Sequence, residues 1–241
     1  MRKVALVTGS NTGIGKETII LFAKNNYDVI ITYYKSIDEA NKLKQDIINN
    51  YNVKCETIKC DISNEEDVKN LYNFVLNKFK KLDVLVNNAA VSDDMILEFK
   101  KIIEFKKVID VNLTGTFMVT KYLYKLINKG CIINVGSTNG IDTYYPESID
   151  YDASKAGIIS LTHNFATMFS PKIRVNAVCP GWVETRQNKN LTVKQINILK
   201  KNILLKRFAQ PQEIAKVIYF IANDATYINN SIIRVDGGSK C

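Results

Sequence analysis

The sequence is poor in residues that mark several common classes of protein. It has a single histidine, His163, and no His, Cys, Asp and Glu cluster with metal-ligand spacing, so we expect no metal site. The cysteines are odd in number and form no Cys-x-x-Cys pair, which argues against a disulfide framework and for a reduced, cytoplasmic protein. They are Cys55, Cys60, Cys131, Cys179 and Cys241. Cys55 and Cys131 lie in strand-like runs and are interpreted as core residues.

Long apolar runs are also missing. No run is long enough to cross a bilayer, and the one at residues 1–7 is too short for a signal peptide. The chain has no internal repeat, low-complexity linker or break in composition. With 46% hydrophobic residues in 241, it can bury a sizeable core. We therefore predict one domain over residues 1–241.

Acidic residues are fewer than basic ones, and the formal net charge is +9. Such a balance can indicate a nucleic acid, a membrane surface or an acidic ligand. The lysines, however, are spread through helical stretches, with no arginine-rich block and no interleaving of aromatic and basic residues. We therefore predict neither nucleic-acid nor membrane binding. An AT-rich coding sequence explains the abundance of Lys, Asn and Ile better than attraction of phosphorylated ligands does.

Short apolar runs alternate with amphipathic stretches along almost the whole chain. Val- and Ile-rich runs separated by helices are typical of a parallel sheet buried on both faces. We expect about seven strands, at 3–8, 29–33, 53–59, 82–86, 131–135, 173–178 and 232–235. We expect helices at 14–26, 37–50, 64–79 (with Ser63 as its N-cap), 101–128 (one or two helices), 150–169 and 213–223. The predicted fold is α/β: a single Rossmann-type, doubly wound parallel sheet with helices on both faces.

Three glycines, Gly9, Gly13 and Gly15, follow the first predicted strand and lead into a helix. Glycine permits unusual backbone dihedrals and lets N–H groups come close to a ligand. The helix N-terminus adds the positive end of its dipole, which favours a phosphate group. The spacing G-x-x-x-G-x-G is not the usual dinucleotide fingerprint, and an ordinary glycine-rich turn is the alternative. In the first βα unit of an alternating chain, we predict a dinucleotide-binding turn.

The end of the second predicted strand has no acidic residue. Dinucleotide-binding folds that recognise the ribose hydroxyls place an Asp or Glu about 20 residues after the glycine turn. This chain has Thr32-Tyr33-Tyr34-Lys35-Ser36 there. No carboxylate would repel a 2′-phosphate, and Lys35, Ser36 or the tyrosine hydroxyls can bind one. The sequence thus favours NADP(H) over NAD(H), the alternative being that Lys35 is only a solvated loop residue.

Tyr151 and Lys155 are four residues apart in a predicted helix and share one face. A cation beside a phenol favours the phenolate and lowers the pKa of the tyrosine. A tyrosine tuned toward neutral pH is a usable general acid or base. Because many solvated helix faces carry Tyr and Lys at this spacing, the pair indicates catalysis only together with the other motifs.

In this order the motifs resemble the short-chain dehydrogenase/reductase family over essentially the whole chain. The stretches that carry the resemblance are Thr8-Gly9-x-x-x-Gly13-Ile14-Gly15, Asn87-Asn88-Ala89, Val111-Asn112-Leu113, Asn134-Val135-Gly136-Ser137, Tyr151-x-x-x-Lys155, Asn176-Ala177-Val178-Cys179-Pro180-Gly181 and Val235-Asp236-Gly237-Gly238. Two positions depart from the family pattern: Ala90 replaces a glycine, and Thr12 stands where many NADP-preferring members carry Arg or Lys.

The resemblance implies both catalytic and cofactor-binding residues. The catalytic residues would be Asn112, Ser137, Tyr151 and Lys155. The cofactor-binding residues would be Gly9, Asn11, Thr12, Gly13, Ile14, Gly15, Tyr34, Lys35, Asp61, Ile62, Asn88, Ala89, Tyr151, Lys155, Pro180, Gly181, Val183 and Thr185. Tyr151 would exchange the proton, Ser137 would bind the substrate oxygen, and Asn112 would place a water that relays protons from Lys155.

The resemblance further implies an NADPH-dependent carbonyl reductase, similar to 3-oxoacyl-[acyl-carrier-protein] reductases, that assembles as a homotetramer. The substrate is a small or carrier-bound carbonyl compound, and residues 186–205 are a mobile lid. The polar loop at 138–150 fits a sugar or polyol dehydrogenase as well, and a non-catalytic dinucleotide sensor is the third reading. His163, within a predicted helix, is interpreted as a packing or surface residue, and Trp182 as either a pocket or a packing residue.

Overall fold

Seven parallel strands form one sheet in the order β3-β2-β1-β4-β5-β6-β7. The structure is a computed structural model that describes residues 2–188 and 191–239. The strands are β1 (Val4–Val7), β2 (Asp28–Tyr33), β3 (Cys55–Lys59), β4 (Val84–Asn87), β5 (Gly130–Val135), β6 (Ile173–Pro180) and β7 (Ile232–Val235). The doubly wound α/β fold predicted from the sequence is confirmed.

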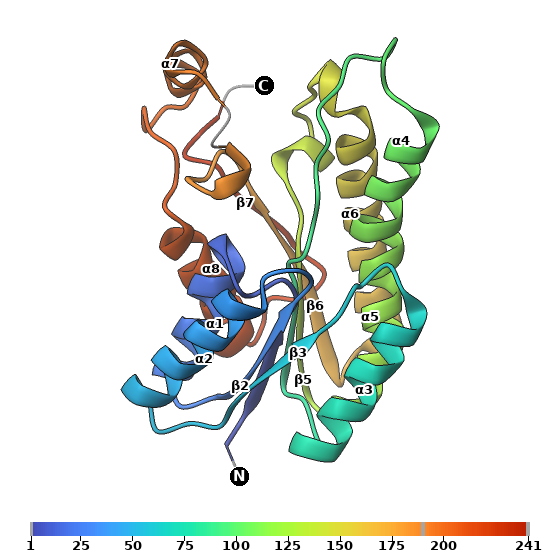
Figure 1. Cartoon of the computed structure of the whole chain (residues 1–241), viewed down its shortest axis with the longest axis vertical. Coiled ribbons are helices and arrows are strands. Elements are labelled where there is room, and N and C mark those ends of the chain that lie inside the picture. The colour runs from blue at the N-terminus through green and yellow to red at the C-terminus, as the bar shows by residue number, and fades with distance from the viewer. Residues whose placement is uncertain (1, 189–190, 240–241) are drawn as a thin grey trace.

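Helices cover the sheet on both faces (Figure 1). One face carries α1 (Gly13–Lys24), α2 (Ile37–Asn50) and α8 (Pro211–Asn223). The other carries α3 (Glu65–Phe79), α4 (Ile102–Ile109), α5 (Gly115–Leu123) and α6 (Ile149–Phe169). Each layer has its own apolar core, one around Phe22 and Ile31 and the other around Leu71 and Ile132. Central strands such as β1 and β4 are buried on both faces, which explains why their residues are apolar without alternation.

The strand order reverses beside β1, because β1 pairs with β2 on one side and with β4 on the other. In open parallel sheets a crevice forms at such a point, outside the carboxyl ends of the strands. The segments that follow β1, β4 and β5 begin at Thr8, Asn88 and Gly136 and meet at this edge. The topology therefore brings together motifs that lie far apart in the sequence.

The predicted helical stretch 101–128 is two α-helices joined by a π-helical turn. The π-helical turn spans Asp110–Thr114, and a 3₁₀ turn at Tyr124–Leu126 follows α5. Asn112, at the centre of the π-helical turn, is buried. A π-helical turn widens the helix and re-aims its side chains, and such turns are frequent at functional sites.

The predicted boundaries agree with the observed ones to within two residues, but the N-cap predicted for α3 is wrong. The cap is Asn64, whose Oδ1 accepts hydrogen bonds from the backbone N–H groups of Glu66 and Asp67 at 2.9 and 3.1 Å. Ser63 instead donates its hydroxyl proton to Asp61 at 2.6 Å. Both residue types cap helices well, so only the observed geometry separates the two.

Several isolated features of the sequence find their places in this fold. Cys55 and Cys131 are core residues, as predicted, and Cys241 lies outside the described residues. His163 is an exposed residue of α6 whose Nδ1 lies 2.6 Å from Asn230 Oδ1. Over the described ranges, no helix is both long and apolar enough to cross a membrane. Those ranges also contain no group of three or more His, Cys, Asp or Glu side chains placed to hold a metal ion.

Candidate active site

The turn between β1 and α1 has a backbone that only glycine fits. Gly9 and Gly13 have positive φ angles of 62° and 55°. A Cβ on Gly15 would lie 2.6 Å from Asn88 Nδ2 and 2.7 Å from the Gly9 carbonyl oxygen. The turn is fixed further by a 2.9 Å hydrogen bond from Gly9 N to Thr32 Oγ1. The N-terminus of α1 thus faces the crevice with its backbone close to any ligand, which suits a pyrophosphate group.

A cavity of about 1080 Å³ opens above the carboxyl ends of the strands. Apart from Gly15, which supports the turn from behind, it is lined by every residue predicted to bind the cofactor. These are Gly9, Asn11, Thr12, Gly13, Ile14, Tyr34, Lys35, Asp61, Ile62, Asn88, Ala89, Tyr151, Lys155, Pro180, Gly181, Val183 and Thr185. The cavity has the size and the glycine-lined backbone that a dinucleotide needs.

One end of the cavity lies beside β2 and β3. Tyr34 and Lys35 line it, and the Lys35 ammonium lies 5.5 Å from the centroid of the Tyr34 ring. Asp61 also lines it, and its Oδ1 accepts hydrogen bonds from the Ser63 backbone N–H and hydroxyl at 3.0 and 2.6 Å. Residues 33–36, at the end of β2, contain no carboxylate, so this segment places no acidic side chain next to Lys35.

A polar contact at the same end of the cavity was not predicted from the sequence. Glu39, in the first turn of α2, accepts a 3.2 Å hydrogen bond from Asn11 Nδ2. It also pairs with Arg186 at 2.5 Å from Nη1 to Oε1, and Arg186 lines the cavity. The only available signal was the charge of the two residues, which lie 147 positions apart. Glu39 therefore connects the glycine turn, α2 and the segment that follows Thr185.

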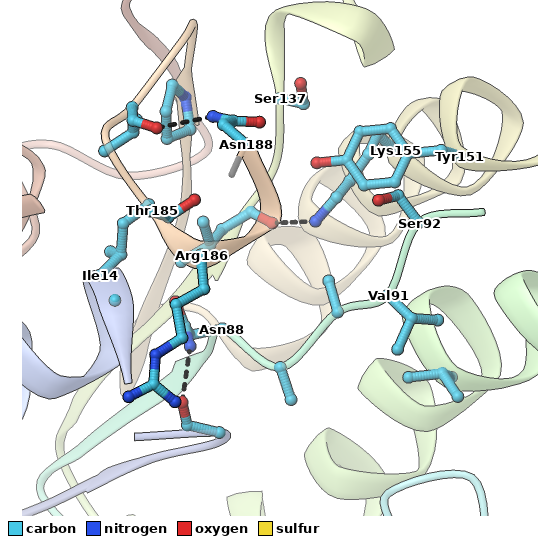
Figure 2. Close-up of a pocket in the computed structure, with 18 of the residues that line it drawn as sticks. Ile14, Asn88, Val91, Ser92, Ser137, Tyr151, Lys155, Thr185, Arg186 and Asn188 are labelled. Atoms are coloured by element: carbon cyan, nitrogen blue, oxygen red, sulfur yellow. Dashed lines mark hydrogen bonds between the residues drawn. The ribbon is translucent and has the colours of Figure 1, made fainter. Parts of the chain in front are cut away.

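The other end of the cavity brings together Ser137, Tyr151 and Lys155 (Figure 2). Ser137 follows β5, whereas Tyr151 and Lys155 are one turn apart on α6. Lys155 is 4% exposed, and its Nζ donates a 2.8 Å hydrogen bond to the Val135 carbonyl oxygen. The ammonium lies 5.4 Å from the centroid of the Tyr151 ring. The phenol and the ammonium thus share one face of α6 and one corner of the cavity.

The pKa values in this corner are set mainly by burial. Burial lowers the pKa of the Lys155 ammonium to about 8, because removal from water disfavours the charged form. Burial also raises the pKa of Tyr151 to about 12, and a hydrogen bond with Ser137 opposes this rise. The sequence predicted the opposite direction for Tyr151. That prediction was wrong, since the loss of hydration on burial outweighs any attraction by the lysine.

Asn112 is buried behind the cavity wall and does not line the cavity. Its Oδ1 accepts a 2.8 Å hydrogen bond from Val91 N, and its Nδ2 donates to Val91 O at 2.9 Å and to Ser154 Oγ at 3.0 Å. The Ser154 hydroxyl in turn donates to the Tyr151 carbonyl oxygen at 2.7 Å. The amide therefore joins the segment after β4 to the turn of α6 that carries Tyr151.

The arrangement is that of a known group of proteins. A sequence profile for the family described as "Enoyl-(Acyl carrier protein) reductase" matches residues 9–240. The chain is 38% identical to a 3-oxoacyl-[acyl-carrier-protein] reductase of Synechocystis sp., over 98% of this chain and 96% of that one. The chain belongs to the short-chain dehydrogenase/reductase family. It is an oxidoreductase of the nicotinamide-dependent type.

Other members of the family differ in substrate while keeping the fold. The chain is 33% identical to glucose 1-dehydrogenase 2 of Bacillus subtilis, over 98% of this chain and 94% of that one. A short-chain dehydrogenase of Burkholderia cenocepacia, solved in complex with NADP, superposes with a TM-score of 0.93. It shares 26% sequence identity, and the match covers 98% of this chain and 97% of that one. The family motifs therefore leave the substrate open.

Part of the cavity wall is formed by residues outside the family motifs. Trp182 and Tyr145 line it and are in contact: the indole Nε1 donates to the Tyr145 hydroxyl at 3.2 Å, and the rings meet edge to face at 5.8 Å. Trp182 also stacks on Phe208 at 5.6 Å. Trp182 is therefore both a pocket and a packing residue. Helix α7 (Val193–Lys201) adds Gln195, Ile198 and Leu199 to this wall.

Proposed function

We propose that this protein reduces a 3-oxoacyl group carried by an acyl carrier protein to the 3-hydroxyacyl group, with NADPH as the reductant. The observation that carries the proposal is the meeting of Ser137, Tyr151 and Lys155 at one end of a cavity whose opposite end begins at the glycine turn. Full-length similarity to the 3-oxoacyl-[acyl-carrier-protein] reductase of Synechocystis sp. supports this choice among carbonyl substrates.

The described residues suggest how the proton is managed. NADPH supplies the hydride when it is bound. Tyr151 gives its phenolic proton to the substrate oxygen, and its raised pKa keeps it protonated at neutral pH, as a general acid must be. The Ser137 hydroxyl donates a hydrogen bond to the same oxygen, where negative charge develops. Lys155, whose pKa of about 8 leaves it mostly charged at pH 7, stabilises the phenolate that remains.

Asn112 contributes to the site without lining the cavity. Its amide hydrogen bonds hold the Val91 backbone and Ser154 in place, so we assign it the positioning of the wall and of α6. The water relay that the family resemblance implies for Asn112 remains part of the proposal. In that relay, the water held by Asn112 would pass on protons from Lys155.

NADPH is favoured over NADH at the other end of the cavity. Lys35 offers a cation, and residues 33–36 offer no carboxylate that would repel a 2′-phosphate. The structural relative from Burkholderia cenocepacia, which binds NADP, supports this choice. Gly9, Asn11, Thr12, Gly13, Ile14 and Gly15 would hold the pyrophosphate. Asp61, Ile62, Asn88 and Ala89 would contact the adenosine side, and Pro180, Gly181, Val183 and Thr185 the nicotinamide side.

The apolar wall formed by Trp182, Leu191, Ile198 and Leu199 favours an acyl chain. A sugar or polyol dehydrogenase is the second candidate, because Asp94, Asn139 and Glu147 also line the cavity and the Bacillus subtilis relative is a glucose dehydrogenase.

Rates of NADPH oxidation with 3-oxoacyl thioesters, on a carrier protein and on a small thiol, test the proposal. Small ketones and, in the reverse direction, glucose and ribitol with NADP⁺ are the comparison substrates. We expect the highest kcat/KM for the carrier-bound 3-oxoacyl substrate. A higher kcat/KM for a sugar would favour the second candidate. Tight NADPH binding without turnover of any substrate would point to a dinucleotide sensor.

Three further features belong to the same proposal. Residues 186–205 would act as a lid, since the segment contributes Arg186, Leu191 and α7 to the cavity wall; Lys189 and Asn190 lie outside the described residues.

The chain would form a homotetramer, with the exposed Phe117 of α5 and Met168 of α6 at one interface and β7 at another. A monomer in light scattering would contradict this. The free thiols of the described cysteines support a cytoplasmic location.

A further inference from the structure

The segment that follows β4 has no regular structure, and it forms part of the cavity wall through Val91, Ser92 and Asp94. Hydrogen bonds join it to the 3₁₀ turn Pro146–Ser148, which leads into α6. Met95 N donates to the Glu147 carbonyl oxygen at 2.8 Å, and the Ser148 hydroxyl donates to Asp94 Oδ1 at 2.9 Å. The wall segment is therefore connected to the 3₁₀ turn that immediately precedes α6.

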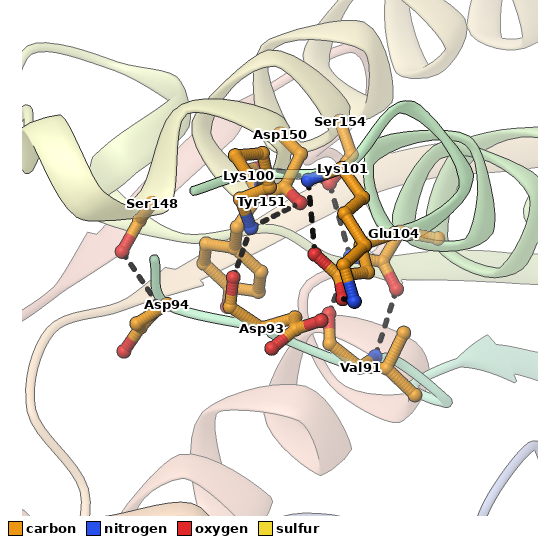
Figure 3. Close-up of polar contacts among 11 residues, drawn as sticks. Val91, Asp93, Asp94, Lys100, Lys101, Glu104, Ser148, Asp150, Tyr151 and Ser154 are labelled. Carbon is orange, nitrogen blue, oxygen red and sulfur yellow. Dashed lines mark hydrogen bonds and ion pairs between the residues drawn. The ribbon is translucent and has the colours of Figure 1, made fainter. Parts of the chain in front are cut away.

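A buried ion pair joins the same segment to α6 itself (Figure 3). Lys100 Nζ lies 2.7 Å from Asp150 Oδ2, and the two side chains are 3% and 0% exposed. Lys100 also donates to the Asp93 carbonyl oxygen. The second carboxylate oxygen of Asp150 accepts a 2.9 Å hydrogen bond from the backbone N–H of Tyr151. One contact chain thus runs from the wall segment to the residue that carries the phenol.

Such a pair needs a reason other than stability. Taking two charges out of water costs nearly as much as their attraction returns, and buried pairs can often be replaced by apolar residues without loss of stability. What a buried pair does supply is a single geometry, because an ammonium and a carboxylate that cannot reach water must stay in contact. Lys101, the next residue, shows the contrast: its side chain is 74% exposed and its Nζ lies 3.8 Å from Glu104.

We propose that Lys100 and Asp150 are positioning residues for the reaction, which hold the first turn of α6, and with it the Tyr151 phenol, in register with the substrate wall. The inference rests on the proposed role of Tyr151 as the proton donor. Neither side chain lines the cavity, so both act through Tyr151 and through the wall segment. A misplacement of a reacting group by about 1 Å can lower a rate by roughly a hundredfold.

The test compares four proteins with the wild type, all as full-length chains. K100M and D150N each leave one buried charge without its partner. The double variant K100M/D150N has neither charge and is the decisive protein, because it removes the connection without stranding an ion. K101M removes the neighbouring exposed lysine and is the matched control. For each protein, kcat, KM, the NADPH dissociation constant and the midpoint of thermal unfolding are measured.

We expect K100M/D150N to unfold near the wild-type temperature and to bind NADPH within about threefold of the wild-type affinity, while kcat falls by about 10- to 100-fold. K101M should match the wild type in every measurement. The single variants should lose both stability and kcat. If the double variant regains wild-type kcat together with its stability, the pair is only structural and the proposal is wrong.

A second readout does not depend on activity. Hydrogen exchange of the NADPH-bound protein, measured on peptides from 93–100 and 147–151, should be faster in K100M/D150N than in the wild type and unchanged in K101M. Unchanged exchange in the double variant would contradict the proposal. Failure of the proposed function would look different: the wild type itself would turn over no carbonyl substrate, or Y151F would remain active.

Discussion

The two ends of the cavity are built from different kinds of contact. At the cofactor end, short turns at neighbouring strand ends hold one another through hydrogen bonds that each include a backbone group: Asn88 N donates to Thr8 Oγ1 at 2.9 Å, and Asn88 Nδ2 donates to the Thr8 carbonyl oxygen at the same distance. At the substrate end, long connections are joined through side chains. Arg234 binds Asp142 through two hydrogen bonds of 2.7 Å, and Lys100 binds Asp150.

This difference explains how one fold can keep a reaction while changing its substrate. A backbone-built site tolerates few substitutions, because even a Cβ at Gly15 would clash. A site built from side-chain contacts changes shape when one contact is exchanged. The relatives, which include a carrier-protein reductase and a glucose dehydrogenase, fit this division.

The largest effect is expected at Tyr151, at the substrate end of the cavity. Y151F removes the proton donor while keeping the ring, so kcat should fall by roughly a thousandfold with NADPH affinity unchanged. Stopped-flow or steady-state NADPH oxidation and a fluorescence titration measure the two quantities. Y144F, on the exposed part of the neighbouring loop, is the control and should keep the wild-type kcat. Comparable turnover by Y151F would refute the proposed mechanism.

The second effect concerns the buried charge of Lys155. Its pKa of about 8 in the folded protein lies below the ordinary value of 10.5, so the folded state favours the neutral amine. Below pH 8, Lys155 is protonated in both the folded and the unfolded protein, so folding must bury a full positive charge. This cost to stability disappears as the pH rises from about 8 to 10.5 and the buried amine becomes neutral. Relative to K155M, the wild type should therefore gain about 3 kcal/mol of stability between pH 7 and pH 10.5.

Denaturant unfolding of both proteins at several pH values measures this difference. The stability of the wild type relative to K155M should rise between pH 8 and pH 10.5. Groups that do not interact with Lys155 cancel between the two proteins, whereas the pKa of the Cys179 thiol, which Lys155 lowers, should be higher in K155M. A difference that is independent of pH would show that Lys155 titrates normally.

The third effect tests the backbone-built end. G15A places a methyl group against the Gly9 carbonyl oxygen and Asn88 and should displace the turn, lowering NADPH affinity by at least about tenfold and the stability by about 1–3 kcal/mol. Calorimetric titration and thermal unfolding are the measurements. K24A, at the exposed far end of α1, should change neither by a comparable amount. Wild-type affinity in G15A would show that this end is less rigid than its contacts indicate.

The smallest effect is expected at Lys35, an exposed cation beside Tyr34. K35A should weaken NADPH binding by about fivefold, in line with the modest strength of an exposed charge contact, and leave NADH binding unchanged. The ratio of the two dissociation constants is the decisive measurement. Equal weakening of both cofactors would mean that Lys35 does not read the 2′-phosphate.

The sequence predicted the cofactor end far better than the substrate end. Gly9, Gly13 and Gly15 indicated a dinucleotide-binding turn without reference to distant residues, since a glycine-rich turn between a strand and a helix has few other functions. The contact between Lys100 and Asp150 could not be found, because it joins residues 50 positions apart through side chains of ordinary type. The capping residue of α3 was misassigned for a related reason: Ser63 and Asn64 are both residue types that cap helices, and only the directions of their side chains in the structure show which one does.

By itself the sequence determined the alternation of strands and helices, the glycine turn, and the residues Ser137, Tyr151 and Lys155. The alternation and the glycine turn follow from local rules, because hydrophobic period and glycine placement act within a few residues. The three side chains were assigned from the resemblance to the short-chain dehydrogenase/reductase family. Only the tertiary structure decided the pKa values, the place of Asn112 behind the wall, and the fastening of the wall to α6. Burial and long-range side-chain contacts exist only once the sheet has brought distant segments together. For that reason the direction of the Tyr151 pKa was inferred wrongly from its neighbour four residues away.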